Sequence, residues 1–597
     1  MEGYTSPAWF ALLSAVNLLR PSALLDLRQA VLLLSFVLSV IAAVCWIRVE
    51  TVASKRSAAE TGDGGENLWR RLASNQTRLN VPLVFLAAWY PIHSFGTSGL
   101  ETPLQFITLT ATVLYVWSGA DRAWAAGAIA AALPLVRPEL GLLSLLLLGW
   151  QWIRSRQLRS ALISFGVLVA TLITVTIFRV MYYGQFLPNT YYAKTDDKHG
   201  IPAGLIYLRD MMLSYGLHWV TAACVLIVVI PFLTGPAKAL SHEQASRTWF
   251  LLSAFVMTTY VVLLGGDFMH ARFLLTSVIL LIAIFAGLGS RSVALLGKDR
   301  TTRVRLALAG TLVIFVATQY TTSVQRLLTR DGDKSAALFK QVEDQEWTFE
   351  KLNPELNEWK TDAHPWEIDG TKTSHLAQVL GTEIGTSTRG IGQFSFQAQH
   401  NHGDVYVYDT LGLTRPDVAR LDMGRRYGRV GHAKEAPDVL VAANPRVDFH
   451  TPYFEGWREN ASFKFDGAGF TIINLDLIDP LVERQIMSAE QARKLREWIL
   501  SKLSGPKVDR NFVTFLTLRY HRDDEISARV RSLGDLDRSS AWRKWLDDTD
   551  RERRILEPDG CSGLNVAECV GRAIERQEAS SFLTTENKPD WADTGQR

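Results

Sequence analysis

Residues 30–47 read AVLLLSFVLSVIAAVCWI, a run of 18 residues that contains two serines and no charged side chain. A membrane-spanning helix needs about 20 mostly apolar residues. The run and its neighbours therefore predict a spanning helix over residues 27–47. The mean hydropathy of the 597-residue chain is only +0.06. This mean is low because it combines the apolar stretches before about residue 320 with a more ordinary, charged sequence after that residue.

Similar apolar stretches follow along the first half of the chain. They cover residues 80–95, 103–119, 122–135, 139–152, 161–182, 217–234, 248–264, 272–288 and 306–321. With the first stretch they predict ten spans, several of them short enough to be tilted or broken. Residues 7–19 (PAWFALLSAVNLL) predict a shorter helix that lies in the membrane interface.

Lysine and arginine residues predict the orientation, because they remain mainly on the cytoplasmic side. Seventeen of them lie in one set of alternate loops, and the opposite set holds six, which are Arg20, Arg137, Lys194, Lys198, Arg209 and Arg272. We therefore expect a multi-pass protein of the bacterial inner membrane. Both the N-terminus and the C-terminal tail should then face the periplasm.

The predicted periplasmic loops are rich in glycine, proline, aromatic and charged residues. They are residues 2–7, 93–103, 136–139, 182–194 and 265–273. Ionisable groups at span ends tend to face a wet cavity or one another, so we expect these loops to share one outer cavity. Each loop also has a structural interpretation. Arg137 could pair locally with Glu139, Asp267 could form a salt bridge with Arg272, and the tyrosines could belong to an aromatic belt.

The remainder, from about residue 322, reads as a soluble tail. Residues 404–408 and 437–441 predict short strands, and Ser488 opens a helix with a capping-box pattern. We expect a transmembrane domain over residues 1–321, an α/β periplasmic domain over 322–480 and a mainly helical extension over 481–597. Binding of an acceptor glycan and a plain structural cap are the two interpretations of the tail.

Charge and cysteine content exclude little. The net charge of +3 gives no reason to expect nucleic acid, and Cys45 and Cys224 lie in apolar runs. Cys561 and Cys569 could form a disulfide if the tail lies outside the cytoplasm, and two unpaired thiols are the alternative. No Cys/His pattern indicates a metal. We expect no cofactor, and a divalent metal is not indicated.

Several of these stretches together resemble a known family. They are EGYTSPAW (2–9), SGLETPL (98–104), VRPE (136–139), YYGQFLPNTYYAK (182–194) and GGDFMHARF (265–273). They are similar to motifs of bacterial glycosyltransferases with the GT-C fold, a group that includes the mycobacterial terminal arabinofuranosyltransferase and flagellar-motor-control proteins. In the tail, residues 390–392, 408–414 (YDTLGLT) and 431–432 extend the resemblance to about residue 435.

The resemblance implies transfer of a sugar from a polyprenyl-phosphate donor to a cell-envelope glycan at the periplasmic face, with inversion. The leaving phosphate requires nearby cations, and the attacking hydroxyl requires a carboxylate base. The candidate catalytic residues are Asp267, Glu101 and Glu2. The candidate donor-phosphate ligands are Arg272, Lys194 and Arg137. The candidate sugar or acceptor ligands are Tyr4, Asn189, Tyr191, Tyr192, Glu139 and His270. The expected partners are the donor, the acceptor glycan and membrane lipids, without nucleic acid.

The chain departs from the family pattern at its start. In the family, the segment that begins here at Met1 follows a first transmembrane helix and part of an outer loop, and that loop carries the aspartate thought to act as base. We therefore expect an N-terminally shortened form, through a wrong start codon or a deletion, whose activity is open. The alternative functions are a non-catalytic envelope or flagellar-motor accessory factor and a membrane transporter.

Overall fold

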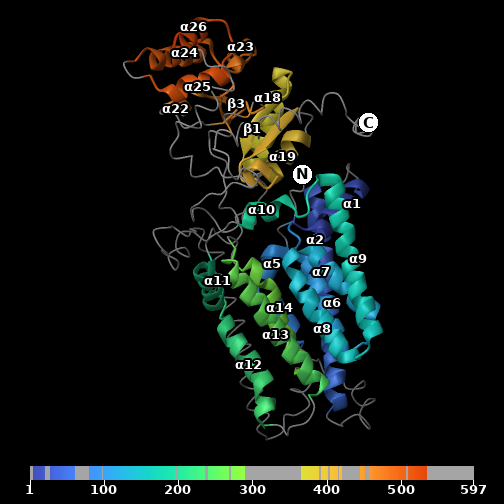
Figure 1. Ribbon diagram of the computed structural model, residues 1–597. Coiled ribbons are helices and arrows are strands. Elements are labelled where there is room, and N and C mark those ends of the chain that lie inside the picture. The colour runs from blue at the N-terminus through green and yellow to red at the C-terminus, as the bar shows by residue number, and fades with distance from the viewer. Residues whose placement is uncertain are drawn as a thin grey trace, which may run out of the picture.

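The computed structural model describes two parts of the chain, a helical bundle and a tail region (Figure 1). Here "bundle" means the described residues up to 288, and "tail region" means those from 365 to 533. The described residues are 5–20, 27–60, 80–96, 99–195, 200–234, 240–267, 271–288, 365–388, 391–400, 404–414, 416–419, 441, 444, 446–450, 456–505 and 508–533.

The bundle is built from helices that follow the predicted apolar segments. Its elements are α1 (Pro7–Leu19), α2 (Leu27–Glu60), α4 (Val81–Ala88), α5 (Tyr90–Gly96), α6 (Thr102–Ser118), α7 (Ala123–Val136), η1 (Pro138–Leu140), α8 (Gly141–Ser155), α9 (Leu158–Tyr183), α10 (Asn189–Thr195), α11 (Gly200–Ser214), α12 (Leu217–Thr234), α13 (His242–Leu263), η2 (Arg272–Leu274) and α14 (Leu275–Ala283). The helical character of every predicted segment that lies in the described residues is thereby confirmed.

Fewer helices than expected are long enough to cross a membrane. Within the described ranges, three pass a test of length and composition, Gln29–Arg56, Leu158–Tyr183 and His242–Leu263. A fourth span results if Ile201–Leu213 and Leu217–Leu233, which meet at an angle of 89°, are taken as one broken span. Of the nine predicted spans that lie in the described residues, three or four therefore correspond to helices long enough to cross a membrane. The other apolar helices among these residues have 17 residues or fewer.

Two differences from the expected helices have clear local causes. The stretch 80–95 is divided at Trp89, whose extended backbone (ψ 101°) separates α4 from α5. Pro91 has no backbone N–H to donate to the carbonyl oxygen of Ala87, and its ring would clash with that carbonyl, so a continuous helix is interrupted just before Pro91. The sequence reading did not anticipate α11, because its 15 residues have only modest hydrophobicity and include Arg209 and Asp210.

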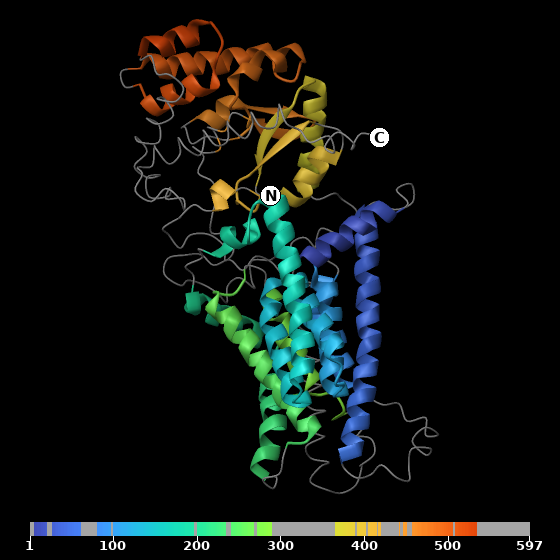
Figure 2. The same ribbon diagram turned by 45° about the vertical axis from the view of Figure 1, so that its right-hand side comes forward.

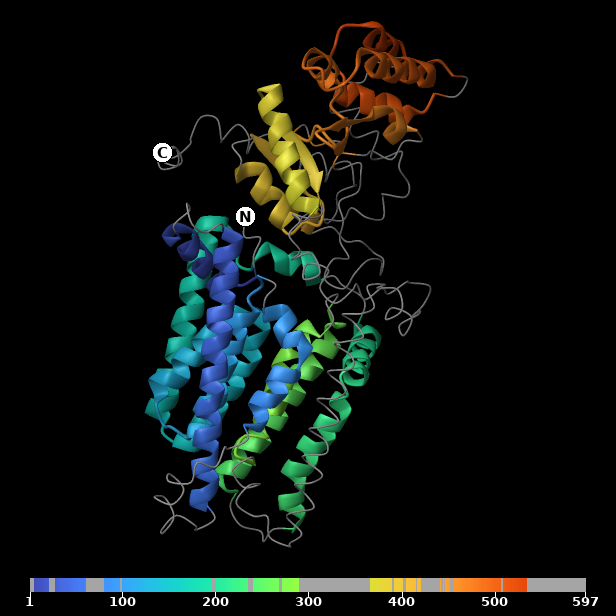
Figure 3. The ribbon, with the colours of Figure 1, turned by 180° about the vertical axis from the view of Figure 1, so that it is seen from behind.

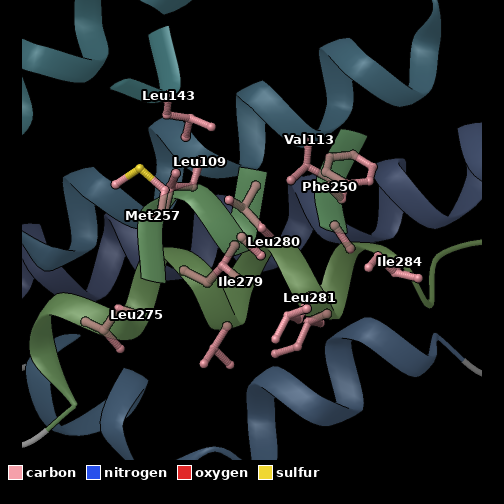
Figure 4. Close-up of a cluster of buried hydrophobic side chains, with 14 of the residues drawn as sticks. Leu109, Val113, Leu143, Phe250, Met257, Leu275, Ile279, Leu280, Leu281 and Ile284 are labelled. Carbon is pink, nitrogen blue, oxygen red and sulfur yellow. The ribbon is translucent and has the colours of Figure 1, made fainter. Parts of the chain in front are cut away.

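The core of the bundle surrounds α14 (Figure 4). Side chains of α14, such as Ile279 and Leu280, are almost completely buried against Leu109 of α6 and Met257 of α13. Every residue of α14 is buried, as expected for a helix that other helices surround. Burial of this apolar surface positions the turn just before α14, which carries Arg272.

One end of the bundle faces the tail region. α1 and α10 lie at that end in all three views (Figures 1, 2 and 3). Ser6 caps α1 by accepting a hydrogen bond from the backbone N–H of Trp9, and the indole N–H of Trp9 donates to the carbonyl oxygen of Gly99 at 3.0 Å. The EGYTSPAW and SGLETPL stretches therefore meet at this end.

The tail region mixes strands and helices and has a hydrophobic core of its own. Strands β1 (Ile384–Thr388) and β2 (Val405–Asp409) are parallel, with Ile384 opposite Val405, and α19 (Ile391–His400) connects them. Strands β3 (Ser462–Phe465) and β4 (Ala468–Thr471) form an antiparallel hairpin. The other elements are α18 (Pro365–Leu380), α20 (Pro416–Ala419), α22 (Trp457–Ala461), η4 (Leu475–Leu477), α23 (Ile478–Glu483), α24 (Ala489–Ser504), α25 (Arg510–Arg519) and α26 (Glu525–Leu533).

Two tail predictions are confirmed and others lie outside the described residues. β2 falls within one residue of the predicted strand 404–408. The capping box at Ser488 is present, with both reciprocal hydrogen bonds to Gln491. The predicted span 306–321, most of the strand 437–441, the Gly431–His432 pair and the cysteine pair Cys561 and Cys569 all lie outside the described residues.

Candidate functional site

The first component of the candidate site is an arginine shared by two glutamates. Arg137 ends α7, and its Nη1 lies 3.1 Å from Oε1 of Glu101, the residue before α6. Its Nε donates to Oε1 of Glu139 in η1. The side chains of Glu101 and Glu139 retain 14% and 16% of their exposure, against 7% for Arg137. The carboxylates therefore lie nearer to solvent than the cation between them.

The second component is a salt bridge across the turn between α13 and α14. The guanidinium of Arg272 donates two hydrogen bonds to Asp267, from Nε to Oδ2 at 2.6 Å and from Nη2 to Oδ1 at 2.9 Å. Asp267 is 3% exposed. This bidentate pairing occupies both carboxylate oxygens, so Asp267 is better placed to orient Arg272 than to accept a proton. The predicted ion pair exists, and its role beyond pairing stays a prediction.

Phe273 connects the two components. Its ring lies 4.7 Å from Cζ of Arg137 and 5.2 Å from Cζ of Arg272, which are cation–π distances. Its backbone N–H donates to the hydroxyl oxygen of Tyr207, a buried residue of α11, at 3.3 Å. The electrostatic interaction of Arg137 also extends to Asp267. We call Glu101, Arg137, Glu139, Asp267 and Arg272 the charged cluster.

The turn that carries Asp267 has an unusual backbone. Gly265 and Gly266 have φ values of 88° and 89°, and Ala271 is also left-handed at 66°. A Cβ added to Gly266 would lie 2.7 Å from the side chain of Tyr207. Only glycine combines this conformation with so close an approach. The double glycine therefore allows Tyr207 to pack against the turn.

α10 carries two neighbouring tyrosines that were predicted to bind the sugar or the acceptor. Tyr191 of α10 is 48% exposed, and its ring packs edge-on against Tyr192 at 5.6 Å. Exposed aromatic faces with polar hydroxyls are suited to contact sugar rings, which agrees with the prediction for Tyr191 and Tyr192 without testing it.

Asn189 was expected to bind a sugar, but the structure engages its amide elsewhere. Its Nδ2 donates to the carbonyl oxygens of Gly412 at 2.6 Å and Leu413 at 3.1 Å, both in the YDTLGLT stretch of the tail region. Asn189 is only 2% exposed. Both amide hydrogens are thus used on the protein backbone, whereas the buried Oδ1 has no hydrogen-bond partner among the described residues. The predicted contact of Asn189 with a sugar stays a prediction.

The remaining candidates have no described side chain. Glu2, Tyr4 and His270 lie outside them, and of Lys194 only the backbone within α10 is described. Among the side chains that the structure describes, no group of three or more His, Cys, Asp or Glu residues could hold a metal ion.

Sequence reasoning missed Tyr207, and it did not assign a role to Phe273. Tyr207 belongs to a helix that was not predicted. Phe273 follows Arg272 in the quoted GGDFMHARF stretch, and its position beside an arginine was the only available signal.

Comparison with known proteins gives a partial likeness. The chain is 29% identical over 230 residues to a terminal beta-(1->2)-arabinofuranosyltransferase of Mycobacterium tuberculosis, covering 34% of this chain and 36% of that protein. It is 34% identical over 223 residues to a terminal beta-(1->2)-arabinofuranosyltransferase of Corynebacterium glutamicum, covering 31% of this chain and 32% of that protein. No family model and no solved structure matches the chain. The chain is therefore similar to these arabinofuranosyltransferases, and it spans about a third of the length of the curated relatives that it matches.

Proposed function

We propose that this chain is a membrane glycosyltransferase that transfers a sugar from a polyprenyl-phosphate donor to a cell-envelope glycan. The observation that carries the proposal is the charged cluster. Its Glu101 closely follows Gly99, whose carbonyl oxygen accepts a hydrogen bond from Trp9 of α1, the helix at the tail-facing end of the apolar bundle. The likeness to two arabinofuranosyltransferases supports a sugar as the transferred group. A lipid-linked donor would keep its chain in the bilayer while its phosphate reaches the bundle end. The lysine and arginine bias of the loops favours the periplasmic side for this end.

The charges of the cluster suggest how a phosphate would bind. Three carboxylates and two arginines give the cluster a formal net charge of −1. An added phosphate would therefore be repelled unless it replaced a carboxylate. Arg137 is the natural place for this exchange. Its buried Nη1 has no hydrogen-bond partner among the described residues, although Glu101 lies within ion-pair range. The donor phosphate would take this Nη1 and release Glu101.

The released Glu101 is our proposed general base. It accepts the proton of the acceptor hydroxyl, whose oxygen forms a bond to the anomeric carbon of the donor sugar. The bond between that carbon and the phosphate oxygen breaks, and the phosphate leaves with the electron pair. Arg137 and Arg272 stabilise the negative charge that develops on the phosphate. Direct displacement of this kind inverts the anomeric configuration. Tyr191 and Tyr192 would contact the sugar.

The test uses the full chain in membranes, with a radiolabelled polyprenyl-phosphate sugar and an envelope-glycan acceptor. Binding of the donor and transfer of the label are measured separately. We expect Arg137→Gln and Arg272→Gln to weaken donor binding and to abolish transfer. Arg247→Gln is the matched control. Arg247 is also buried and paired with a glutamate, Glu243, at 2.6 Å, but it lies near the other end of α13.

The outcomes separate the alternatives. Equal loss of donor binding in Arg137→Gln and Arg247→Gln would indicate general destabilisation and contradict a phosphate site. Donor binding without transfer in the unmodified chain would support the site and contradict a complete enzyme. If the unmodified chain neither binds donor nor transfers sugar, the proposal fails and a non-catalytic envelope factor becomes the better interpretation.

A further inference from the structure

We propose that Asn189 is a positioning residue that docks α10 onto the loop 409–414 of the tail region and so positions Tyr191, a sugar contact in the proposed function. This inference rests on the proposed function for its catalytic consequence, but not for the docking itself. It changes the interpretation of Asn189 from a sugar ligand to a connection between the bundle and the tail region.

The loop 409–414 is held by hydrogen bonds of its own, separate from its contact with Asn189. Both carboxylate oxygens of Asp409 accept hydrogen bonds from the loop, Oδ1 from the N–H of Leu411 at 3.0 Å and Oδ2 from the N–H of Thr414 at 2.6 Å. Gly412 adopts a φ of 74°, and a Cβ there would lie 2.7 Å from the backbone nitrogen of Ala419. The loop is therefore closed on Asp409 and packed tightly against α20.

This fixed loop presents two carbonyl oxygens to one amide. The two hydrogens of the Asn189 amide group match the carbonyls of Gly412 and Leu413, and the contact is buried. Buried carbonyls without a donor are costly, so the pairing is specific for an amide at this position. In Figures 1, 2 and 3, α10 lies between the bundle and the tail region, as this contact requires.

The other end of the connection is Tyr191, two residues further along α10. Its N–H donates to the carbonyl oxygen of Pro188 at 2.9 Å, which fixes the first turn around Asn189. Tyr191 is 48% exposed, and its ring packs edge-on against Tyr192 at 5.6 Å. A displacement of Asn189 would therefore also displace Tyr191, which is a sugar contact in the proposed function.

The first experiment measures docking without catalysis. Hydrogen–deuterium exchange of the detergent-solubilised full chain is compared for the unmodified protein, Asn189→Asp and Asn189→Ala. Aspartate has the same shape but places a carboxylate oxygen against two carbonyl oxygens, whereas alanine only removes the donors. The matched control is Asn460→Asp, because the Asn460 amide also donates to a backbone carbonyl, that of Gly456 at 2.7 Å, within the tail region.

We expect both Asn189 variants to exchange faster in 189–195 and 411–414. The increase should be at least tenfold for Asn189→Asp and smaller for Asn189→Ala. Asn460→Asp should change exchange only around α22. Unchanged exchange at 411–414 in both Asn189 variants would overturn the proposal. So would equal acceleration throughout the chain, since this would indicate that Asn189 supports folding in general.

The second experiment measures sugar transfer. We expect Asn189→Ala to lower kcat/KM at least tenfold while donor binding changes less than threefold, because Arg137 and Arg272 remain in place. Loss of donor binding with unchanged exchange would show that Asn189 is a ligand and overturn the inference. If the unmodified chain transfers no sugar, the proposed function fails, and the exchange experiment still decides the docking.

Discussion

The guanidinium of Arg137 lies 4.7 Å from the centre of the Phe273 ring, and this contact joins two ion-pair groups from distant parts of the sequence. Without it, the Glu101–Arg137–Glu139 group and the Asp267–Arg272 pair would be two separate salt bridges at helix ends. With it, both arginines lie against one aromatic side chain, and their positions depend on each other. The geometry of the proposed phosphate site therefore depends on Phe273.

Replacement of Phe273 by leucine should weaken donor binding. Leucine retains most of the apolar volume but has no aromatic face for the two guanidinium groups. A cation–π contact contributes about 0.5–2 kcal/mol, so we expect donor affinity to fall roughly 2- to 30-fold. Titration of donor into the purified chain provides the measurement. Phe285→Leu is the control, because Phe285 is buried against another ring, that of Phe85, at 5.0 Å. Equal losses in both variants would argue against a specific role of Phe273.

Glu101 and Glu139 should respond differently to conversion into glutamine. A general base accelerates its step about 10²- to 10⁴-fold, so Glu101→Gln should lower kcat at least a hundredfold while donor still binds. Glu139 is not a general base in our proposal, so Glu139→Gln should lower kcat much less. Glu243→Gln tests the loss of a buried, arginine-paired glutamate at a distant position. If the order of Glu101 and Glu139 is reversed, the assignment of the base is wrong.

The sequence indicated where the cluster would arise, for a physical reason. Arg137, Asp267 and Arg272 stand out because charged residues at the ends of apolar segments are costly to bury alone. The helices themselves could also be predicted, since long apolar stretches such as residues 30–47 leave few alternatives. The lengths of the helices were harder to predict. Trp89 breaks a segment that hydropathy alone treats as continuous.

The partners of these residues were not accessible in the same way. Nothing in the sequence says that Arg137 faces Glu101 and Phe273, because those contacts join segments separated by 36 and 136 residues. Asn189 shows the limit most clearly. Its neighbours Tyr191 and Tyr192 favoured a sugar site, yet its amide is used by Gly412 and Leu413, more than two hundred residues away.

Asp267 and Arg272 should be strongly coupled in stability. Removal of one member of a buried pair leaves an uncompensated charge, which typically costs about 3–5 kcal/mol. We therefore expect Asp267→Asn and Arg272→Gln each to lower the unfolding midpoint of the full chain, and the double variant to lose less than the sum. Unfolding in detergent, followed by circular dichroism, gives the midpoints. Strict additivity would show that the two side chains do not stabilise each other.

The tail region should carry a pH dependence from Asp409. Burial is the largest influence on this carboxyl and raises its pKa above the ordinary 3.8, although hydrogen bonds from Thr414, Leu411 and Gly412 act in the opposite direction. A raised folded-state pKa means that the folded protein binds the proton more tightly. The stability that this group contributes is fully present at a pH below its pKa in the unfolded state, and it is lost as the pH rises through its pKa in the folded state. Asp409→Asn should therefore flatten this fall in unfolding midpoint.

Asp466 offers a control of opposite sign. The hydrogen bond from Lys372 lowers the pKa of the exposed Asp466 carboxyl below 3.8. The stability that Asp466 contributes is therefore present at a pH above its pKa in the unfolded state, and it is lost as the pH falls through its pKa in the folded state. Asp466→Asn should leave the fall described for Asp409 intact. If both variants change the pH profile in the same direction, the assignment to Asp409 is wrong.

Gly266 should be intolerant of any side chain, whereas Gly149 should not. At Gly266 an added Cβ meets the Tyr207 side chain at 2.7 Å, and the backbone φ of 89° is itself unfavourable for alanine. Left-handed backbone costs about 1–2 kcal/mol and overpacking about 1–3 kcal/mol. Gly266→Ala should therefore lower the unfolding midpoint and also weaken donor binding, because the turn that holds Asp267 must shift.

Gly149, within α8, has open space around its Cβ position. Gly149→Ala should be neutral or stabilising by about 0.5–1 kcal/mol. A Gly266→Ala protein with unchanged donor affinity would mean that the turn does not position Arg272, and the connection from Tyr207 through Phe273 to the charged cluster would have no functional consequence.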